Sequence, residues 1–271
     1  MIDLHSHIIP GIDDGAPDLN ASLQMARIAV SDGIRVMAAT PHITPGVYNN
    51  NVQTIERGAA ILRQALKLHN LPLELTTGAD VHVTPNMAGP LLEGQWPRLA
   101  ATRYFLFEPP HRVMPPHLVR LAENLMASGL VPVLTHPERL GWIEHHYDVI
   151  CELGEIGAVV QLTAGSVTGD FGKRPQYWSE RMLAEGRVDI LATDAHNVTS
   201  RPPVLSRARD FVAHRYGDEA AVRMVGSNPL QILLNEPIAK SRVTVQVQTE
   251  SLPSPSVWQR VSKFARLHAH A

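Results

Sequence analysis

The sequence has little of several features that would indicate other classes of protein. It contains a single cysteine, Cys151, so no internal disulfide can form, and a reducing cytoplasm is the expected location. The 24 lysine and arginine residues stand against 26 aspartate and glutamate residues, a balance that provides no basic field for a nucleic-acid backbone. No apolar run approaches the roughly 20 residues that span a bilayer, and no charged-then-apolar leader precedes residue 5. We therefore expect neither a nucleic-acid partner nor an integral membrane segment.

Helix-like and strand-like segments alternate along most of the chain. Apolar residues recur at helical spacing from 19 to 30, after Asp18 or Asn20 as a cap and before Gly33 as a stop. The same spacing returns from 52 to 66. Further helices are expected at about 118–127, 142–153 and 177–184. Strand-like runs are MIDLHSH, IRVMAAT, LELTTGAD, YFLFE, VPVLTH, AVVQLT and VDILAT.

This alternation predicts the fold class. Strands that alternate with helices form βαβ units and a parallel sheet, so the chain is expected to be an α/β protein. About seven strands in this length favour a closed or nearly closed barrel. A doubly wound open sheet is the alternative.

The sequence predicts a C-terminal extension after the main domain. Residues 1–235 are expected to form one domain, and 236–271 a C-terminal extension in which SLPSPS acts as a linker. From 257 to 267 the apolar residues Trp258, Val261 and Ala265 fall on one side, which predicts a short amphipathic helix. Packing on the domain is its expected role, and docking to a membrane surface or partner is the alternative.

Metal-capable side chains follow the strand-like runs. In the opening MIDLHSH, alternation of side chains between faces places His5 and His7 on the same side, together with Asp3. The carboxyl ends of parallel barrel strands form one mouth, so residues far apart in the sequence are expected to meet there. The side chains in such positions are His5, His7, His42, Asp80, Glu108, His136, Asp194 and His196.

These residue types predict a hydrolytic metal centre. Imidazoles and carboxylates without a thiolate suit manganese, iron or zinc. The set offers more ligands than one ion needs, so two or three divalent ions are expected. Clustered ions activate water and bind the attacking and leaving oxygens of a phosphoryl displacement. Hydrolysis of a phosphate ester or amide is therefore the expected reaction.

Several segments also carry a resemblance to a known family. MIDLHSHIIPGIDDGA, ATPH, THPER and TDAHN, followed by NPLQILLN, resemble in order and spacing the polymerase and histidinol phosphatase (PHP) superfamily. Within it, the chain is most similar to the bacterial capsule-type, metal-dependent protein tyrosine phosphatases. The resemblance runs from Met1 to about Asn235. It implies a distorted, TIM-like parallel (β/α)7 barrel with three metal ions at the carboxyl ends of the strands, usually manganese or iron.

The resemblance also assigns roles to individual residues. It implies that His5, His7 and Asp194 hold the first ion, that Asp80 bridges it to the second, that Glu108 and His136 complete the second, and that Asp14, His42 and His196 hold the third. Asp14 and His42 are thereby also expected to take part in catalysis. The family usually has glutamate at the bridging position. Asp80 is one methylene shorter, and Glu74, at the start of the strand, cannot replace it.

A phosphate site also needs cations, and two arginines fall near the predicted mouth. Arg139 follows His136 and Arg201 follows His196, where the family has its phosphate-binding arginines. Guanidinium offers a bidentate fork that lysine lacks. A surface salt bridge is the alternative for either residue. His82 is a candidate for supporting the ligands, and His111, His117 and Tyr48 are candidates for contact with the substrate.

The resemblance predicts a phosphotyrosine-protein phosphatase acting on a membrane-bound bacterial tyrosine autokinase in capsule or exopolysaccharide regulation. The alternatives are a phosphatase of a small ester such as histidinol phosphate, or an inactive metal-binding regulatory module. A homo-oligomer remains open. A cysteine-based mechanism is disfavoured because Gly157, not arginine, stands six residues after Cys151.

Overall fold

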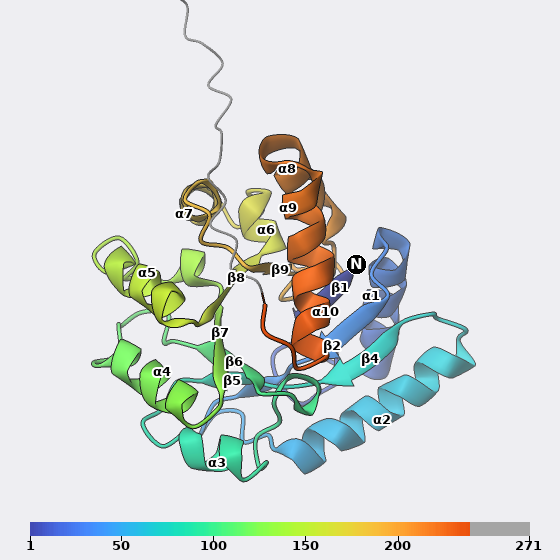
Figure 1. The fold of residues 1–271 in the computed structure, drawn as a ribbon. Helices are drawn as coiled ribbons and strands as arrows, with labels where there is room; N and C mark the ends of the chain where they lie inside the picture. The colour runs from blue at the N-terminus through green and yellow to red at the C-terminus, as the bar shows by residue number, and fades with distance from the viewer. Residues whose placement is uncertain (239–271) are drawn as a thin grey trace, which may run out of the picture.

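The structure is a computed structural model and describes residues 1–238 (Figure 1). Its strands are β1 (Ile2–Ser6), β2 (Val36–Ala39), β3 (His42–Ile43), β4 (Glu74–Thr77), β5 (Asp80–His82), β6 (Tyr104–Glu108), β7 (Val131–Thr135), β8 (Val159–Thr163) and β9 (Ile190–Ala192). Its α-helices are α1 (Leu19–Asp32), α2 (Val52–Leu68), α3 (Ala88–Leu92), α4 (Leu118–Ala127), α5 (Tyr147–Ile156), α6 (Ala164–Val167), α7 (Lys173–Ala184), α8 (Ser206–Tyr216), α9 (Asp218–Val222) and α10 (Asn228–Leu233). Short 3-10 helices lie at η1 (Leu99–Ala101) and η2 (Pro137–Arg139), and a π-helical turn, η3 (Arg223–Ser227), joins α9 to α10.

The first two long helices begin and end at residues whose chemistry favours those limits. Asp18 caps α1 by accepting a hydrogen bond from the Ala21 amide at 2.8 Å, and Gly33 ends it in the left-handed conformation at φ 92°. Asn51 and Thr54 form a capping box at the start of α2. Both helices were predicted by their apolar spacing, and both are confirmed.

The strands pair in parallel and join into a ring. One sheet has the order β1-β2-β4, and the other has the order β3-β5-β6-β7-β8-β9. The sheets meet where β2 leads into β3 and β4 into β5, and again at a parallel bridge between Ser6 and Ala195. Within residues 1–238, nine strands become seven when β2 with β3, and β4 with β5, are each counted as one interrupted strand. The predicted parallel α/β fold is confirmed, and its strands form a distorted ring, not a doubly wound sheet.

Apolar side chains fill the two spaces that this arrangement creates. A smaller cluster lies between the strands and includes Leu4, Leu106, Val133 and Ile190, with Ile232 of α10 packed against it. A larger cluster lies between the strands and the surrounding helices. This packing fixes the strands relative to one another and so determines where their carboxyl ends meet.

Two sequence predictions of secondary structure need correction, and one helical region was missed. The run LELTTGAD forms two strands, β4 and β5, interrupted at residues 78–79, and a Cβ at Gly78 would lie 2.9 Å from Leu99 Cδ2. The helix predicted over 142–153 begins only at Tyr147, since Trp142 is buried in the preceding turn and its Nε1 donates to the Pro110 carbonyl. The helices after β9 were not predicted; in Figure 1, α8, α9 and α10 form a column beside the sheet.

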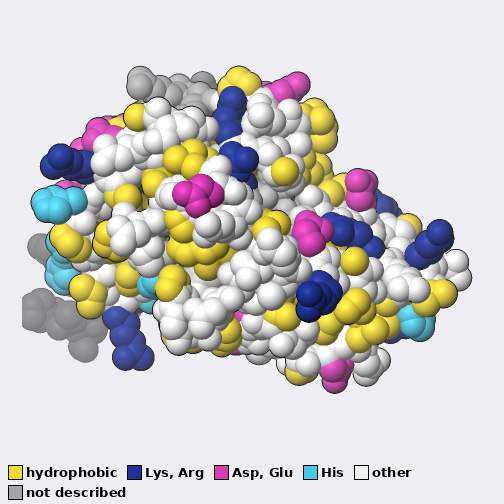
Figure 2. All heavy atoms as spheres, turned by 90° about the horizontal axis from the view of Figure 1, so that it is seen from below, with side chains coloured by type: hydrophobic (Ala, Val, Ile, Leu, Met, Phe, Trp, Pro, Cys, Tyr) yellow, Lys and Arg dark blue, Asp and Glu magenta, His cyan; other side chains and the backbone are white. Residues whose placement is uncertain are grey.

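Charged side chains are mixed on the surface seen in Figure 2. On that face, basic groups lie among acidic and apolar ones. Among residues 1–238, no helix has both the length and the apolar character needed to cross a bilayer. The linker and amphipathic helix predicted within 236–271 fall, from residue 239 onward, outside the described residues.

Candidate metal centre

The structure brings the predicted metal-capable side chains together at the carboxyl ends of the strands. Each belongs to at least one group of three or four side chains whose potential ligand atoms all lie within 4.8 Å of one another. The residues so joined are His5, His7, Asp14, His42, Asp80, Glu108, His136, Asp194 and His196. Strand ends separated widely in sequence therefore meet at one cluster, as the barrel hypothesis required.

Asp194 lies at the centre of the first group. Its Oδ1 lies 3.3 Å from Nε2 of His5 and 3.3 Å from Nε2 of His7, and these two nitrogens are 3.2 Å apart. Asp194 adopts the left-handed conformation at φ 51°, which aspartate tolerates better than most residues. Two imidazole nitrogens facing one carboxylate oxygen offer three donor atoms to a single cation.

Asp80 lies between this group and the next. Its Oδ2 is 3.5 Å from His5 Nε2 and 3.4 Å from His42 Nδ1, and the residue is fully buried. Within residues 1–238, neither carboxylate oxygen of Asp80 has a hydrogen-bond partner. A buried carboxylate without hydrogen bonds needs positive charge nearby, and a bound cation would supply it to both oxygens. The Nδ1 atoms of His42 and His136 and Nε2 of His196 are buried without hydrogen bonds too, so the cluster fits a metal.

A further group forms on the exposed side of the cluster. Asp14 Oδ1 lies 3.6 Å from His42 Nε2 and 3.4 Å from His196 Nε2. Asp14 reaches this position because the loop after β1 passes directly over His7, where the Ala16 amide donates to the His7 carbonyl at 3.0 Å. Gly15 is required there, since a Cβ would lie 2.1 Å from the His7 carbonyl oxygen.

Glu108 and His136 lie on the other side of Asp80. His136 Nε2 is 3.9 Å from Glu108 Oε1. His82 Nδ1 lies 3.3 Å from Glu108 Oε2. This contact agrees with the prediction that His82 orients a metal ligand. His111 lies at the same carboxylate and belongs to one group with Glu108 and His136. Tyr48, another of the three substrate candidates, stacks on the His42 ring at a centroid distance of 5.7 Å.

Sequence reasoning missed two groups that orient the imidazoles. Asp13 Oδ2 lies 2.7 Å from His7 Nδ1 and also accepts the His42 amide at 3.0 Å. Gln161 Oε1 lies 2.9 Å from His5 Nδ1. Such contacts fix which ring nitrogen faces the metal position. Gln161 could have been found as the polar residue within the apolar run AVVQLT, and Asp13 as the neighbour of Asp14.

One residue predicted to lie with the histidines is engaged elsewhere. The Asp3 carboxylate accepts hydrogen bonds from the Thr193 amide, at 3.0 Å, and from the Thr193 hydroxyl. A register shift between Asp3 and Ser6 interrupts the alternation that placed Asp3 beside His5. Burial raises the pKa of Asp3 to about 6 despite these hydrogen bonds.

The cluster alters the protonation of its own imidazoles. Burial opposes charge on His5, but the carboxylates of Asp194 and Asp80 outweigh it and raise the pKa of His5 to about 9. Burial likewise lowers the pKa of His42, and Asp80, Glu108 and Asp14 together raise it to about 10. Without a metal, protons on these rings balance the carboxylates.

Metal binding is therefore expected to release protons. Imidazole must be neutral to bind a metal, and His5 and His42 are protonated near neutral pH because their pKa values lie near 9 and 10. Metal affinity should rise with pH until those values are passed, with about two protons released near neutral pH. Calorimetric titration with MnCl₂ in buffers of different ionisation enthalpy counts these protons. Uptake of metal without proton release would contradict the expectation.

Two arginines reach the same centre. Nη1 of Arg139 and Nη2 of Arg201 both donate to Asp194 Oδ2, the latter at 2.5 Å. Their side chains are 21% and 23% exposed, so each guanidinium is open to a ligand at the mouth. The Arg139 guanidinium also lies 5.1 Å from the centre of the Phe171 ring, which holds it by a cation–π contact. The arrangement offers positive charge beside the metal-capable cluster.

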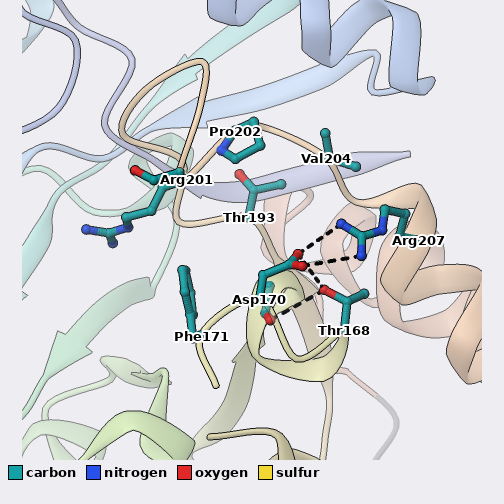
Figure 3. Close-up of a pocket in the computed structure, with 10 residues that line it drawn as sticks. Thr168, Asp170, Phe171, Thr193, Arg201, Pro202, Val204 and Arg207 are labelled. Carbon is teal, nitrogen blue, oxygen red and sulfur yellow. Dashed lines mark hydrogen bonds and ion pairs between the residues drawn. The ribbon is translucent and has the colours of Figure 1, made fainter. Parts of the chain in front are cut away.

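A pocket of about 110 Å³ begins behind Arg201 (Figure 3). Phe171 and Thr193 form part of its wall. On another side of the pocket, Arg207 donates two hydrogen bonds to Asp170, at 3.0 and 3.3 Å. In Figure 3 the Arg201 side chain points away from this ion pair. The charge of Arg207 is thus balanced by Asp170, whereas Arg201 donates to Asp194 in the metal-capable cluster.

Cys151 lies away from this chemistry. It is in α5, as expected, and burial raises the pKa of its thiol. A reactive cysteine requires a lowered pKa. The structure therefore agrees with the sequence argument against a cysteinyl intermediate.

Comparison with known proteins agrees with this geometry. The chain is 35% identical over 238 residues to the tyrosine-protein phosphatase YwqE of Bacillus subtilis, covering 88% of this chain and 93% of that protein. It is 29% identical to the putative tyrosine-protein phosphatase CapC of Staphylococcus aureus, over 89% of this chain and 94% of that one. A crystal structure from work on YwqE and Streptococcus pneumoniae CpsB, described as metal-dependent tyrosine phosphatases, superposes with a TM-score of 0.86 at 34% identity. That match covers 89% of this chain and 98% of the other. Residues 1–234 match the family described as capsular polysaccharide synthesis, CpsB/CapC, and the chain belongs to that family.

Proposed function

We propose that this chain is a metal-dependent protein-tyrosine phosphatase that hydrolyses phosphotyrosine to tyrosine and inorganic phosphate. The observation that carries the proposal is the convergence of imidazoles, carboxylates and two arginines on Asp194 and its neighbours. The relatives named tyrosine-protein phosphatases support the substrate class.

We propose two or three divalent ions for the cluster, with manganese preferred and iron or zinc as alternatives. The proposed holders are His5, His7 and Asp194 for the first ion, Asp80 between the first and second, Glu108 and His136 for the second, and Asp14, His42 and His196 for the third. Such ions supply a water of lowered pKa and positive charge for phosphoryl oxygens. The buried, unpartnered oxygens of Asp80 support this assignment.

The remaining roles fall to groups at the mouth. Arg139 and Arg201 would bind the non-bridging phosphate oxygens, for which a planar guanidinium is well suited. Both already donate to Asp194, and this contact holds them beside the cluster before substrate arrives. Asp14 is 47% exposed and His42 15%, so these two side chains are proposed to face the substrate as well as to hold metal.

The proposed substrate is the tyrosine-rich part of a membrane-bound bacterial tyrosine autokinase that controls capsule or exopolysaccharide assembly, with dephosphorylation in the cytoplasm. Membership of a family described by capsular polysaccharide synthesis supports this choice. We further propose that residues 1–235 form the phosphatase domain and that 236–271 form an extension. Homo-oligomerisation is compatible with the proposal but is not needed to complete the cluster, because every proposed ligand comes from one chain.

Side-by-side hydrolysis assays test the substrate assignment. With MnCl₂ present, a phosphotyrosyl peptide should be hydrolysed with a kcat/KM at least about tenfold above that of histidinol phosphate or a DNA 3′-phosphate end. Preference for histidinol phosphate would replace the protein substrate by a small ester. Metal binding without hydrolysis of any of the three would instead indicate an inactive regulatory module.

A further inference from the structure

His111, considered above only for contact with the substrate, lies within the metal-capable cluster itself. Its Nε2 is 3.6 Å from Glu108 Oε1, the same oxygen that lies 3.9 Å from His136 Nε2. The rings of His111 and His136 have centroids 5.0 Å apart. Two imidazole nitrogens therefore face one carboxylate oxygen. His5 and His7 face Asp194 Oδ1 in the same way.

The segment that carries His136 also holds His111 in place. The Gly141 amide donates to the His111 carbonyl at 2.7 Å, and Trp142 Nε1 donates to the Pro110 carbonyl at 2.9 Å. A Cβ at position 141 would lie 3.0 Å from the His111 carbonyl oxygen, so glycine permits this approach. The loop after β6 is thereby fixed against the turn after β7, and the two histidines meet at Glu108.

Among residues 1–238, Asp80 and His136 share no ligand group. The Asp80 carboxylate belongs to two of the groups whose ligand atoms lie within 4.8 Å of one another. One group contains His5 and His7, and the other contains His42 and Glu108. His136 shares its own groups with His5 and Asp194, and with Glu108 and His111. Glu108 and His136 alone would give an ion two protein ligands, and metal sites that retain an open position for water usually have three. His111 is placed to supply the third.

We propose that His111 is a protein ligand of the metal position formed by Glu108 and His136, where it supplements the bridging contact proposed for Asp80. The proposal rests on the metal-dependent function above. The His111 side chain is 38% exposed, so this ligand lies on the open side of the position. Neutral imidazole and carboxylate together suit manganese, iron or zinc.

Metal content tests the proposal without relying on activity. Wild type, His111→Ala and His117→Ala are dialysed against defined free Mn²⁺ and assayed by elemental analysis. His117, from the same loop, belongs to none of the ligand groups and serves as the matched control. We expect His111→Ala to bind one ion about tenfold or more weakly than wild type, and His117→Ala to match wild type. A second variant, Asp80→Glu with His111→Ala, should recover binding because the longer carboxylate reaches farther.

Three outcomes would overturn the proposal: wild-type stoichiometry and affinity in His111→Ala, an equal loss in His117→Ala, or no recovery in the Asp80→Glu, His111→Ala double variant. Failure of the proposed function is distinguishable from these. Wild type that binds metal but hydrolyses no phosphotyrosyl peptide contradicts the phosphatase alone, while weakened binding in His111→Ala still supports the ligand assignment. Wild type that binds no metal contradicts both.

Discussion

Asp194→Asn is expected to lower kcat/KM for a phosphotyrosyl peptide by at least about a thousandfold. Asp194 faces His5 and His7 through Oδ1 and accepts from both arginines through Oδ2. Asparagine keeps the shape and tolerates the left-handed conformation at φ 51°, but removes the charge that a cation needs. The loss should therefore come from metal binding and from the arginines, not from misfolding.

Steady-state kinetics with saturating MnCl₂, together with thermal denaturation of the metal-free proteins, measure this effect. Asp210→Asn is the matched control, since Asp210 is an exposed carboxylate paired with Arg209. It should retain wild-type activity. An Asp194→Asn variant that keeps a tenth or more of wild-type kcat/KM and an unchanged metal content would contradict the role of Asp194 in metal binding.

Arg139→Ala and Arg201→Ala are each expected to reduce kcat/KM by about a hundredfold or more, for any phosphate ester. Both guanidinium groups lie beside the metal-capable cluster and are open at the mouth. The corresponding lysine variants should recover only part of the loss, because an ammonium group cannot form two parallel hydrogen bonds. The two alanine effects should not add in the double variant, since both side chains act on the same group.

Arg207→Ala provides the comparison for both arginines. Arg207 lies in the pocket behind Arg201 but is bound to Asp170 (Figure 3). Its removal should change kcat/KM by no more than a few-fold, as expected for a partly exposed ion pair. If Arg207→Ala were as damaging as Arg201→Ala, the pocket itself would have to bind the phosphate.

The fold was predictable where local patterns and packing agree. α1 and α2 carry caps and apolar faces that agree with their burial, and β6 is a continuous apolar run that is buried throughout. The pattern failed where tertiary contacts override it. Trp142 and its neighbours have helical spacing but form a turn that binds the loop after β6. α8, the first helix after β9, lacked a strong apolar period, because only Ala208 and Val212 of its residues are buried.

The candidate site was predictable because barrel topology brings strand ends together. The sequence places His5, Glu108 and Asp194 near the carboxyl ends of strand-like runs. In a parallel barrel these ends lie on one face, so the three side chains could be expected to meet there. Asp3 was misplaced because a register shift is not visible in an alternating pattern. The support that Gln161 gives to His5 depends on the neighbouring position of β8, which spacing alone does not reveal. His111 was considered only for substrate contact, since its approach to Glu108 depends on a loop held by Gly141.

The most direct test of the account is manganese-dependent hydrolysis of a phosphotyrosyl peptide by wild type and by the His5→Ala, His7→Ala double variant. Both histidines are fully buried and lie 3.3 Å from Asp194 Oδ1. The account predicts turnover by wild type that disappears on chelation, returns with MnCl₂, and is absent from the folded double variant. Turnover by wild type that persists without metal, or turnover by the double variant at a similar rate, would contradict it.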